Sequence, residues 1–304
     1  MTLSLTPAGH KVALVIGSGG IKCAAAYGVM AVLQREAIPI DMVVACSGGA
    51  FCGVWVADGA TGDARAESAR FAQGWEGTFD RRSWRGIAKA LFPRAFGFDG
   101  ALGLIDDRRL NRALADFVGE RRFDDLPRPL HLVATDFDTG EQVVLSHGRL
   151  FDAIRASVSI PLVLPPWMLH GRKLVDGALC DPLPVDIAVR EGADVIIAVG
   201  FEESLQPRGT IQSAMGLVLQ LKTVIVNHLY RSQYAFYSLS HHAEVIPVMP
   251  DVEFPVGLRD ASVVPRLFER GVAAAEREIP YLRKLLGVPA PAVAITAREA
   301  EDAS

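Results

Sequence analysis

Two short hydrophobic runs, each followed by a glycine turn and a second apolar stretch, predict the elements near the N-terminus. The first run, VALVI at residues 12–16, ends in Gly-Ser-Gly-Gly at 17–20, and the Ala-rich, largely apolar residues 21–36 follow. A short apolar run such as 12–16 is typical of a buried strand, whereas the stretch 21–36 is long enough to form a helix. The order therefore predicts a strand, a glycine turn and a helix.

The same pattern repeats at once. Residues 40–46 predict a second buried strand, Ser-Gly-Gly at 47–49 predicts a tight turn, and the apolar residues 50–57 predict a helix. Strand–turn–helix units in succession indicate a parallel sheet.

The rest of the chain continues this alternation. Residues 61–128 are mostly helical in pattern, except that 80–104 combine repeated Gly and aromatic residues and predict an irregular segment. We expect strands at 130–135, 142–146, 173–175, 194–200 and 243–250, and helices at 150–157, after Pro182, at 212–240 and at 262–286. The pattern predicts an α/β fold with a mostly parallel sheet and helices on both faces. We expect one domain over 11–288, with its motifs in 11–200, further helices and a strand in 201–288, and a mobile tail at 289–304.

Composition narrows the class of protein. Half of the 304 residues are hydrophobic and the formal net charge is −4, which suits a large core and argues against a nucleic-acid binder. No apolar stretch reaches the roughly 18 residues that span a bilayer, and residues 1–11 do not resemble a signal peptide. The four cysteines have neither metal-ligand nor disulfide spacing. We therefore expect a cytoplasmic protein, although a peripheral position at a membrane or lipid surface fits the same pattern.

Ser47 lies at the second glycine turn, where a serine can act as a nucleophile. A tight strand-to-helix turn lifts the hydroxyl clear of the sheet, and the helix N-terminus behind it offers N–H groups. Gly49, two residues after the serine, and Ala45, in place of the usual first glycine, meet most of the need for small neighbours. A serine N-cap explains the same residues.

The first glycine turn, from Gly17 to Gly20, places free N–H groups after a strand, where they can bind a phosphate or an oxyanion. Lys22 stands where the dinucleotide fingerprint has its third glycine, and Cys23 stands where a P-loop has Ser or Thr. Both nucleotide motifs therefore fail. Lys22 is either a positive charge that favours an oxyanion or an exposed helix lysine.

Asp176 is the candidate base. Most serine nucleophiles need a base, and none of the seven histidines lies in a motif that pairs with a serine turn. Those residues are His10, His131, His147, His170, His228, His241 and His242. Asp176 ends a predicted strand, at the edge where open α/β sheets bind ligands. A turn or N-cap aspartate is the alternative, and Asp181 and Asp186 are interpreted as cap and surface residues.

Taken together and in this order, these motifs resemble the patatin-like phospholipase family. GSGGIK is similar to the family's oxyanion loop, ACSGGA to its nucleophile elbow and LVDGALCDPLPV to its catalytic Asp segment. ATDFDTGEQVV and AIRASVSIPLVLPP agree with the stretches between them, so that the resemblance runs from about residue 11 to 200.

The resemblance implies a three-layer α/β/α fold and a Ser–Asp dyad that works without histidine, metal or cofactor. By position, Ser47 is the nucleophile and Asp176 is the general base. The backbone N–H groups of Ser18, Gly19, Gly20 and Ile21 line the oxyanion hole. The supporting motif positions are Gly17, Lys22, Gly49, Gly177 and Ala178.

The chain departs from the family pattern at four positions. Ala45, Ser18 and Cys23 replace glycines, and Lys22 replaces an arginine. The methyl group of Ala45 adds bulk beside a strained turn, so these changes bear on efficiency and substrate range.

The leading hypothesis is therefore an esterase or phospholipase A type hydrolase of acyl lipids, with an acyl-lipid or other ester substrate and neither a nucleotide nor a nucleic acid as partner. Hydrolysis of another ester, such as a storage polyester, and lipid binding without catalysis are the alternatives. Residues 80–104 and 212–240 are candidates for a lid and an acyl channel, and the second segment is more simply interpreted as core. The cysteines beside the motifs (Cys23, Cys46 and Cys180) indicate buried packing or, as the sharper alternative, a thiol-sensitive site.

Overall fold

One mixed β-sheet runs through the computed structural model, which describes residues 9–96, 102–202, 211, 214–239, 243–254 and 256–289. The strand order is β5-β6-β3-β2-β1-β7-β8, with β4 paired to β3. The strands are β1 (Val12–Ile16), β2 (Met42–Cys46), β3 (Leu130–Asp136), β4 (Gln142–Leu145), β5 (Trp167–Leu169), β6 (Arg172–Asp176), β7 (Val195–Val199) and β8 (Glu244–Val248).

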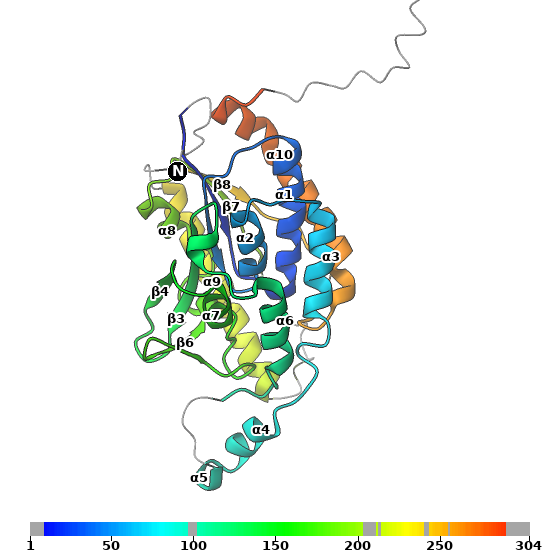
Figure 1. Ribbon diagram of the computed structural model, residues 1–304, viewed down its shortest axis with the longest axis vertical. Coiled ribbons are helices and arrows are strands. Elements are labelled where there is room, and N and C mark those ends of the chain that lie inside the picture. The colour runs from blue at the N-terminus through cyan, green and yellow to red at the C-terminus, as the bar shows by residue number, and fades with distance from the viewer. Residues whose placement is uncertain are drawn as a thin grey trace, which may run out of the picture.

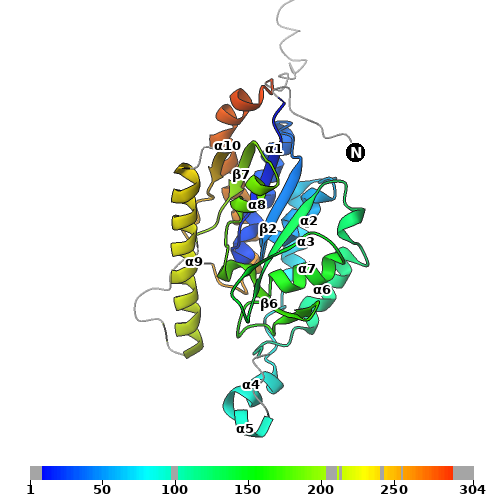
Figure 2. The same ribbon diagram turned by 90° about the vertical axis from the view of Figure 1, so that its left-hand side faces the viewer.

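Helices cover both faces of this sheet (Figure 1). The α-helices are α1 (Ala25–Arg35), α2 (Gly49–Ala57), α3 (Ala64–Trp75), α4 (Trp84–Leu91), α5 (Pro93–Phe96), α6 (Arg108–Val118), α7 (Leu150–Ser157), α8 (Val185–Arg190), α9 (Ala214–Leu239) and α10 (Val264–Leu286). Short 3-10 helices are η1 (Gly20–Ala24), η2 (Phe123–Asp125), η3 (Gly177–Leu179) and η4 (Ala261–Val263). Figure 2 shows α9 running lengthwise beside the sheet and α4 and α5 projecting from its lower end.

Alternate residues of the central strands enter two separate cores. In β1, Leu14 and Ile16 pack on the side of α1, α2 and α10, whereas Ala13 and Val15 pack on the side of α8 and α9. A parallel strand covered on both faces has to be apolar throughout, which explains the unbroken run VALVI. The three-layer α/β/α prediction is thus confirmed.

The sheet is parallel only in its central and β8-side part. Strands β3, β2, β1, β7 and β8 run parallel, whereas β4 and β6 pair antiparallel with β3, and β5 pairs antiparallel with β6. β3 extends three residues past the end of β2, because Cys46 pairs with Val133 and β3 ends at Asp136. β6 pairs with this extension and returns to Ala134, which lies opposite Asp176.

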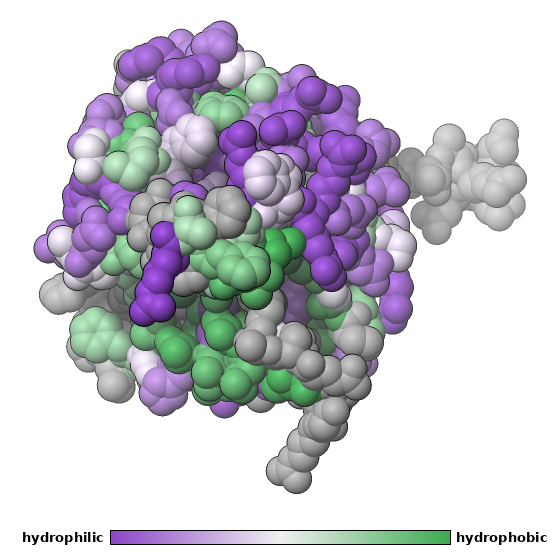
Figure 3. Space-filling model, turned by 90° about the horizontal axis from the view of Figure 1, so that it is seen from below, coloured by the Kyte–Doolittle hydropathy of each residue, from purple (hydrophilic) through white to green (hydrophobic). Residues whose placement is uncertain are grey.

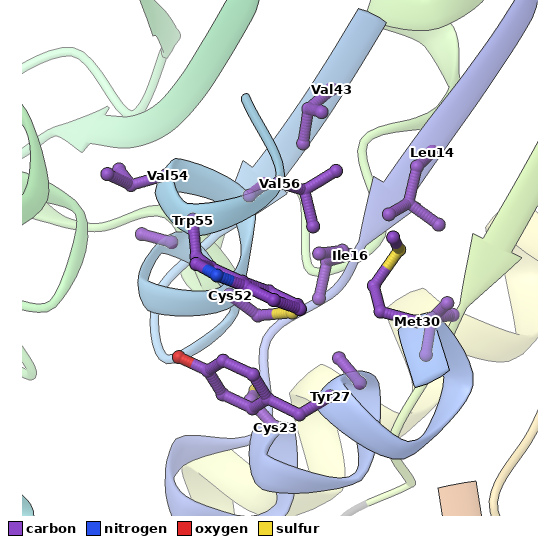
Figure 4. Close-up of a cluster of buried hydrophobic side chains, with 14 of the residues drawn as sticks. Leu14, Ile16, Cys23, Tyr27, Met30, Val43, Cys52, Val54, Trp55 and Val56 are labelled. Atoms are coloured by element: carbon purple, nitrogen blue, oxygen red, sulfur yellow. The ribbon is translucent and has the colours of Figure 1, made fainter. Parts of the chain in front are cut away.

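The core beneath α1 and α2 is dense and includes two thiols. Figure 4 shows Cys23 and Cys52 among apolar side chains, and the rings of Tyr27 and Trp55 lie 5.6 Å apart. The sulfur atoms fill this space as small apolar groups would.

Two glycines let α1 and α10 cross closely. A Cβ at Gly28 would lie 2.0 Å from the Phe268 carbonyl oxygen, and a Cβ at Gly271 would lie 1.8 Å from that of Ala25. Any side chain at these positions would force the helices apart, so α10 is fixed against the helix that follows the glycine loop.

Three local predictions differ from the structure. Residues 20–24 form the 3-10 helix η1 before α1 begins, and the short strand β5 went unpredicted. The segment 80–104 is not simply irregular, because Ser83 caps α4 by accepting a hydrogen bond from the Gly86 amide at 3.1 Å. The predicted tail lies outside the described residues, except for residue 289.

No helix among the described residues is long and apolar enough to cross a membrane.

Ala45, which replaces the first glycine of the elbow, faces Gly53 of α2. A Cβ at Gly53 would lie only 2.8 Å from the Cβ of Ala45. The methyl group on the strand is therefore accommodated by a missing methyl group on the helix.

We expect Gly53→Ala to lower the free energy of unfolding by about 1–3 kcal/mol, because a new methyl group overpacks the contact with Ala45. Ala45→Gly removes that clash, so the double variant should be at least about 1 kcal/mol more stable than the sum of the two single effects. Urea unfolding of the four proteins measures this coupling. Simple additivity would show that the two positions do not compensate each other.

Candidate active site

Ser47 occupies a strained turn between β2 and α2. Its φ angle is +53°, in the left-handed region that costs a non-glycine residue about 1–3 kcal/mol. Two close approaches force this turn: a Cβ at Gly48 would lie 2.4 Å from the Gly20 carbonyl oxygen, and one at Gly49 would lie 2.7 Å from that of Gly17. The elbow thus packs backbone to backbone against the glycine loop.

The Ser47 hydroxyl donates a hydrogen bond to Asp176, with 2.7 Å between Oγ and Oδ2. Both residues are nearly excluded from solvent, with exposed fractions of 5% and 3%. The sequence-based prediction placed Asp176 near Ser47 for the wrong reason. It assumed that the strand before Asp176 ends at the carboxyl edge shared by the parallel strands, whereas β6 is antiparallel to β3. Asp176 reaches Ser47 because β6 returns along the extension of β3. A hydroxyl bonded to a buried carboxylate can lose its proton as it attacks an electrophile.

Residues at the end of α7 hold both partners. The Ser47 amide donates to Ser157 Oγ at 2.8 Å, and the Asp176 amide donates to the Ser159 carbonyl oxygen at 2.9 Å. The fully buried Arg155 donates to Ser159 Oγ at 2.6 Å and to Asp107 at 2.7 Å. This arginine is a positioning residue that residue chemistry alone did not indicate. The residues that follow it, ASVS at 156–159, belong to a stretch that resembles the family's, but only the structure shows that they hold Ser47 and Asp176 in place.

The carboxylate of Asp176 is fixed from the chain that follows it. Its Oδ1 accepts a hydrogen bond from the Ala178 amide at 2.9 Å, and its carbonyl oxygen accepts one from Thr135 Oγ1 at 2.9 Å. A Cβ at Gly177 would lie 2.4 Å from the Val133 carbonyl oxygen. The N-cap interpretation of Asp176 is therefore also correct, because one oxygen caps η3 while the other faces Ser47.

The glycine loop offers fewer free donors than the sequence suggests. The Ser18 amide donates to the Pro182 carbonyl oxygen at 2.8 Å, so it is not available to a ligand. Within the described part of the chain, the amides of Gly19, Gly20 and Ile21 donate no hydrogen bond, which leaves three candidate oxyanion donors. The Ser18 hydroxyl is buried and has no partner among the described residues.

Helix α9 braces both halves of the site. Tyr230 donates its hydroxyl proton to the Ser18 carbonyl oxygen at 2.7 Å, and Gln233 donates to Asp181 Oδ1 at 2.7 Å. Tyr230 fits here because residue 17 is glycine: a Cβ at that position would lie 2.2 Å from the Tyr230 hydroxyl oxygen. Nothing in the sequence pointed to these two residues.

A cavity of about 240 Å³ opens over Ser47 and Asp176. It is lined by Ser18, Gly19, Gly20, Ile21, Lys22, Ser47, Ile160, Val163, Asp176, Ala178, Leu219, Gln220, Lys222, Thr223, Val256, Gly257 and Leu258. None of the described histidines lines it; His241 and His242 lie outside the described residues. Lys22 is buried rather than exposed and donates to the Glu202 carbonyl oxygen at 2.8 Å.

The pattern of the chain matches a known family model over residues 14–189, which is more than half of its length, and that model describes patatin-like phospholipases. The chain belongs to the patatin-like phospholipase family.

Relatives within and near this family share moderate identity with the chain. An NTE family protein of Mycobacterium tuberculosis is 34% identical over 194 residues, which are 64% of this chain and 50% of that protein. The patatin-like phospholipase domain-containing protein 7 of Mus musculus is 28% identical over 194 residues, or 63% of this chain and 14% of that protein. The chain thus spans about half the length of the mycobacterial relative.

A solved structure gives a looser match. The crystal structure of VipD from Legionella pneumophila aligns with a TM-score of 0.49 at 14% identity, covering 91% of this chain and 69% of that one.

Among the departures from the patatin-like pattern, the cysteines favour packing over reactivity. Cys23, Cys46 and Cys52 are buried, Cys180 is partly buried, and the four form no disulfide. Burial raises the pKa of Cys46 and Cys52 well above the ordinary value, and it raises the pKa of Cys180 to about 11. Thiols with raised pKa values are poor nucleophiles.

Asp181 is another buried carboxyl, five residues after Asp176. Burial, followed by the neighbouring Asp186, raises the pKa of Asp181 to about 8. The interpretation of Asp181 as an ordinary cap residue is thus too simple, because its side chain accepts hydrogen bonds from both Gln142 and Gln233.

The pKa of Asp181 predicts how stability changes with pH. A carboxyl whose pKa rises from 3.8 unfolded to about 8 folded holds its proton more tightly when folded, so the free energy of unfolding falls as pH rises between these values. We expect Asp181→Asn to flatten this decline, measured by urea unfolding from pH 5 to pH 9. Asp116→Asn, at an exposed carboxyl on α6, is the matched control and should keep the wild-type slope. Equal slopes in all three proteins would contradict the protonated state of Asp181.

Proposed function

We propose that this chain is a lipid acyl hydrolase in which Ser47 is the nucleophile and Asp176 is the general base. The observation that carries the proposal is the 2.7 Å hydrogen bond between a serine held at a positive φ angle and a buried carboxylate. Membership of the patatin-like phospholipase family supports the class of reaction.

The reaction proceeds through an acyl-enzyme. Ser47 Oγ attacks the ester carbonyl carbon while Asp176 takes the serine proton, and Asp176 then returns that proton to the leaving alcohol. In the second half, Asp176 takes a proton from water, the resulting hydroxide attacks the acyl-serine, and the fatty acid leaves as Ser47 regains its proton. The Ala178 amide on Oδ1 leaves Oδ2 directed at Ser47 throughout both halves.

Negative charge on the carbonyl oxygen is stabilised by the free amides of Gly19, Gly20 and Ile21. These donors need no rearrangement, because the elbow and the loop are in backbone contact at Gly48 and Gly20. The Ser18 amide does not belong to this oxyanion hole, since its hydrogen is already bonded to the Pro182 carbonyl oxygen.

The cavity favours an acyl ester that carries an anionic group. Two lysines, Lys22 and Lys222, line the cavity, which otherwise holds the single carboxylate Asp176 and apolar or neutral side chains. A phosphate of a phospholipid head group matches this charge, whereas a neutral storage polyester does not. The substrate is therefore a phospholipid, reached from a lipid surface.

Hydrolysis of short p-nitrophenyl esters tests the dyad. Ser47→Ala and Asp176→Asn should each lower kcat/KM by about 10³-fold or more, as loss of a nucleophile or its base does in serine hydrolases. Two matched controls should keep wild-type activity: Ser68→Ala, at a buried hydroxyl with no partner among the described residues, and Asp116→Asn, at an exposed carboxyl on α6. Full activity in either dyad variant would refute the mechanism, and an inactive wild-type protein that still binds lipid would favour the non-catalytic alternative.

A separate comparison tests the head group. We expect Lys222→Met to lower kcat/KM for a phospholipid about tenfold or more relative to a diacylglycerol with the same acyl chains, because charge-assisted hydrogen bonds contribute about 1.5–3 kcal/mol. Lys222→Arg should preserve the preference for the phospholipid. An equal loss on both substrates would show that Lys222 does not bind an anionic group.

A further inference from the structure

Helix α4 is joined by backbone hydrogen bonds to a segment that lines the candidate active site. It projects from the end of the molecule seen at the bottom of Figures 1 and 2. Its base is fixed by close backbone packing, because a Cβ at Gly86 would lie 1.9 Å from the Gly103 carbonyl oxygen. The helix is thus attached firmly at one side.

A chain of backbone hydrogen bonds links α4 to the cavity wall. The Ser83 amide donates to the Leu104 carbonyl oxygen at 2.8 Å, and the Leu104 amide donates to that of Leu162 at 2.9 Å. The next amide, that of Ile105, donates to the carbonyl oxygen of Val163, which lines the cavity. A contact that fixes α4 is therefore transmitted by backbone hydrogen bonds to the wall of the cavity.

The outer side of α4 is apolar and uncovered. Trp84, Leu91 and Phe92 are 69%, 67% and 60% exposed, and Trp84 and Leu91 lie two turns apart on one stripe. Figure 3 views this end of the molecule and shows hydrophobic residues gathered between hydrophilic ones.

Helix α9 adds a second apolar stripe beside the mouth. Leu217 and Leu221 are 50% and 54% exposed, while Leu219 and Lys222 of the same turns line the cavity. Helix α9, which lines the cavity, and α4, which is hydrogen-bonded to the cavity wall through residues 104 and 105, thus both present large apolar side chains outward. A large exposed apolar surface is unusual on a monomeric protein in water and therefore indicates a contact site.

The charge within residues 81–96, which include α4, is one-sided. Residues 81–96 contain no Asp or Glu, although the chain as a whole has a formal net charge of −4. The basic residues in this segment are Arg81, Arg82, Arg85, Lys89 and Arg94. The four arginines form no ion pair within the described part of the chain.

We propose that α4 docks on an anionic phospholipid surface, with Trp84, Leu91 and Phe92 inserted among the acyl chains and the arginines at the head groups. A basic amphipathic helix with Trp and Leu on its apolar face binds lipid interfaces in this way. Docking turns the mouth of the cavity toward the membrane and lets a phospholipid enter without crossing water. This role rests on the proposed function only in that the docked lipid is also the substrate.

A second copy of the chain is a poorer occupant. In a two-fold dimer through this surface each patch meets its own copy, so the arginines of one α4 would face those of the other. An anionic bilayer offers negative head groups to the arginines and acyl chains to the apolar stripe.

Vesicle co-sedimentation of Ser47→Ala protein, which cannot digest the lipid, tests the docking. The parent should bind vesicles of phosphatidylglycerol and phosphatidylcholine at least tenfold more tightly than pure phosphatidylcholine, and 0.5 M NaCl should abolish that preference. Trp84→Ala/Leu91→Ala and Arg82→Gln/Arg85→Gln should each weaken binding to the anionic vesicles by tenfold or more. The matched controls Trp84→Phe/Leu91→Met and Arg82→Lys/Arg85→Lys should bind like the parent.

In the active background, the same α4 variants should hydrolyse short p-nitrophenyl esters at the wild-type rate and lose activity only on anionic vesicles. Unchanged vesicle binding by both disrupted variants would overturn the docking, and so would a dimer, seen by light scattering, that dissociates when Trp84 and Leu91 are replaced. A wild-type protein inactive on all esters would refute the proposed hydrolysis instead, while its vesicle binding would still decide the role of α4.

Discussion

The structure depends on one strained contact: Ser47, held at a φ angle of +53°, donates its hydroxyl proton to the buried Asp176. A conformation this unfavourable persists only when its surroundings over-determine it. Here the glycine loop presses on the elbow through Gly48 and Gly49, and Ser157 accepts the hydrogen of the Ser47 amide. The strain is offset by burial in two apolar cores, and it places the hydroxyl where a substrate carbonyl can reach it.

Support for this contact comes from parts of the chain far apart in sequence. Arg155 and the residues that follow it hold Ser47 and Asp176 in place, and Tyr230 of α9 holds the glycine loop. Helix α9 also lines the cavity and exposes apolar residues outward, so in our proposal it joins the lipid-facing surface to the catalytic site. The apolar, basic helix α4 is hydrogen-bonded to the cavity wall through residues 104 and 105.

The sequence predicted the central layers well and the supports poorly. Runs such as 12–16 and 40–46 are decisive because strands buried on both faces must be apolar throughout. The pairing of Ser47 with Asp176 came from the joint motif pattern, since neither residue is distinctive alone. The antiparallel return of β6, the occupied amide of Ser18 and the burial of Lys22 depend on contacts with distant residues, which no local pattern encodes. The core interpretation of residues 212–240 holds for one face only, because α9 buries Val226 and Tyr230 but leaves Leu217, Leu221 and Ile225 about half exposed.

Covalent labelling tests the central claim most directly. The protein is incubated with a fluorophosphonate, digested, and mapped by mass spectrometry to find the modified residue. The account predicts a single stoichiometric adduct on Ser47, formed much more slowly when Asp176 is replaced by Asn. An adduct on another serine, or labelling of Ser47 at an equal rate without the carboxylate, would contradict it.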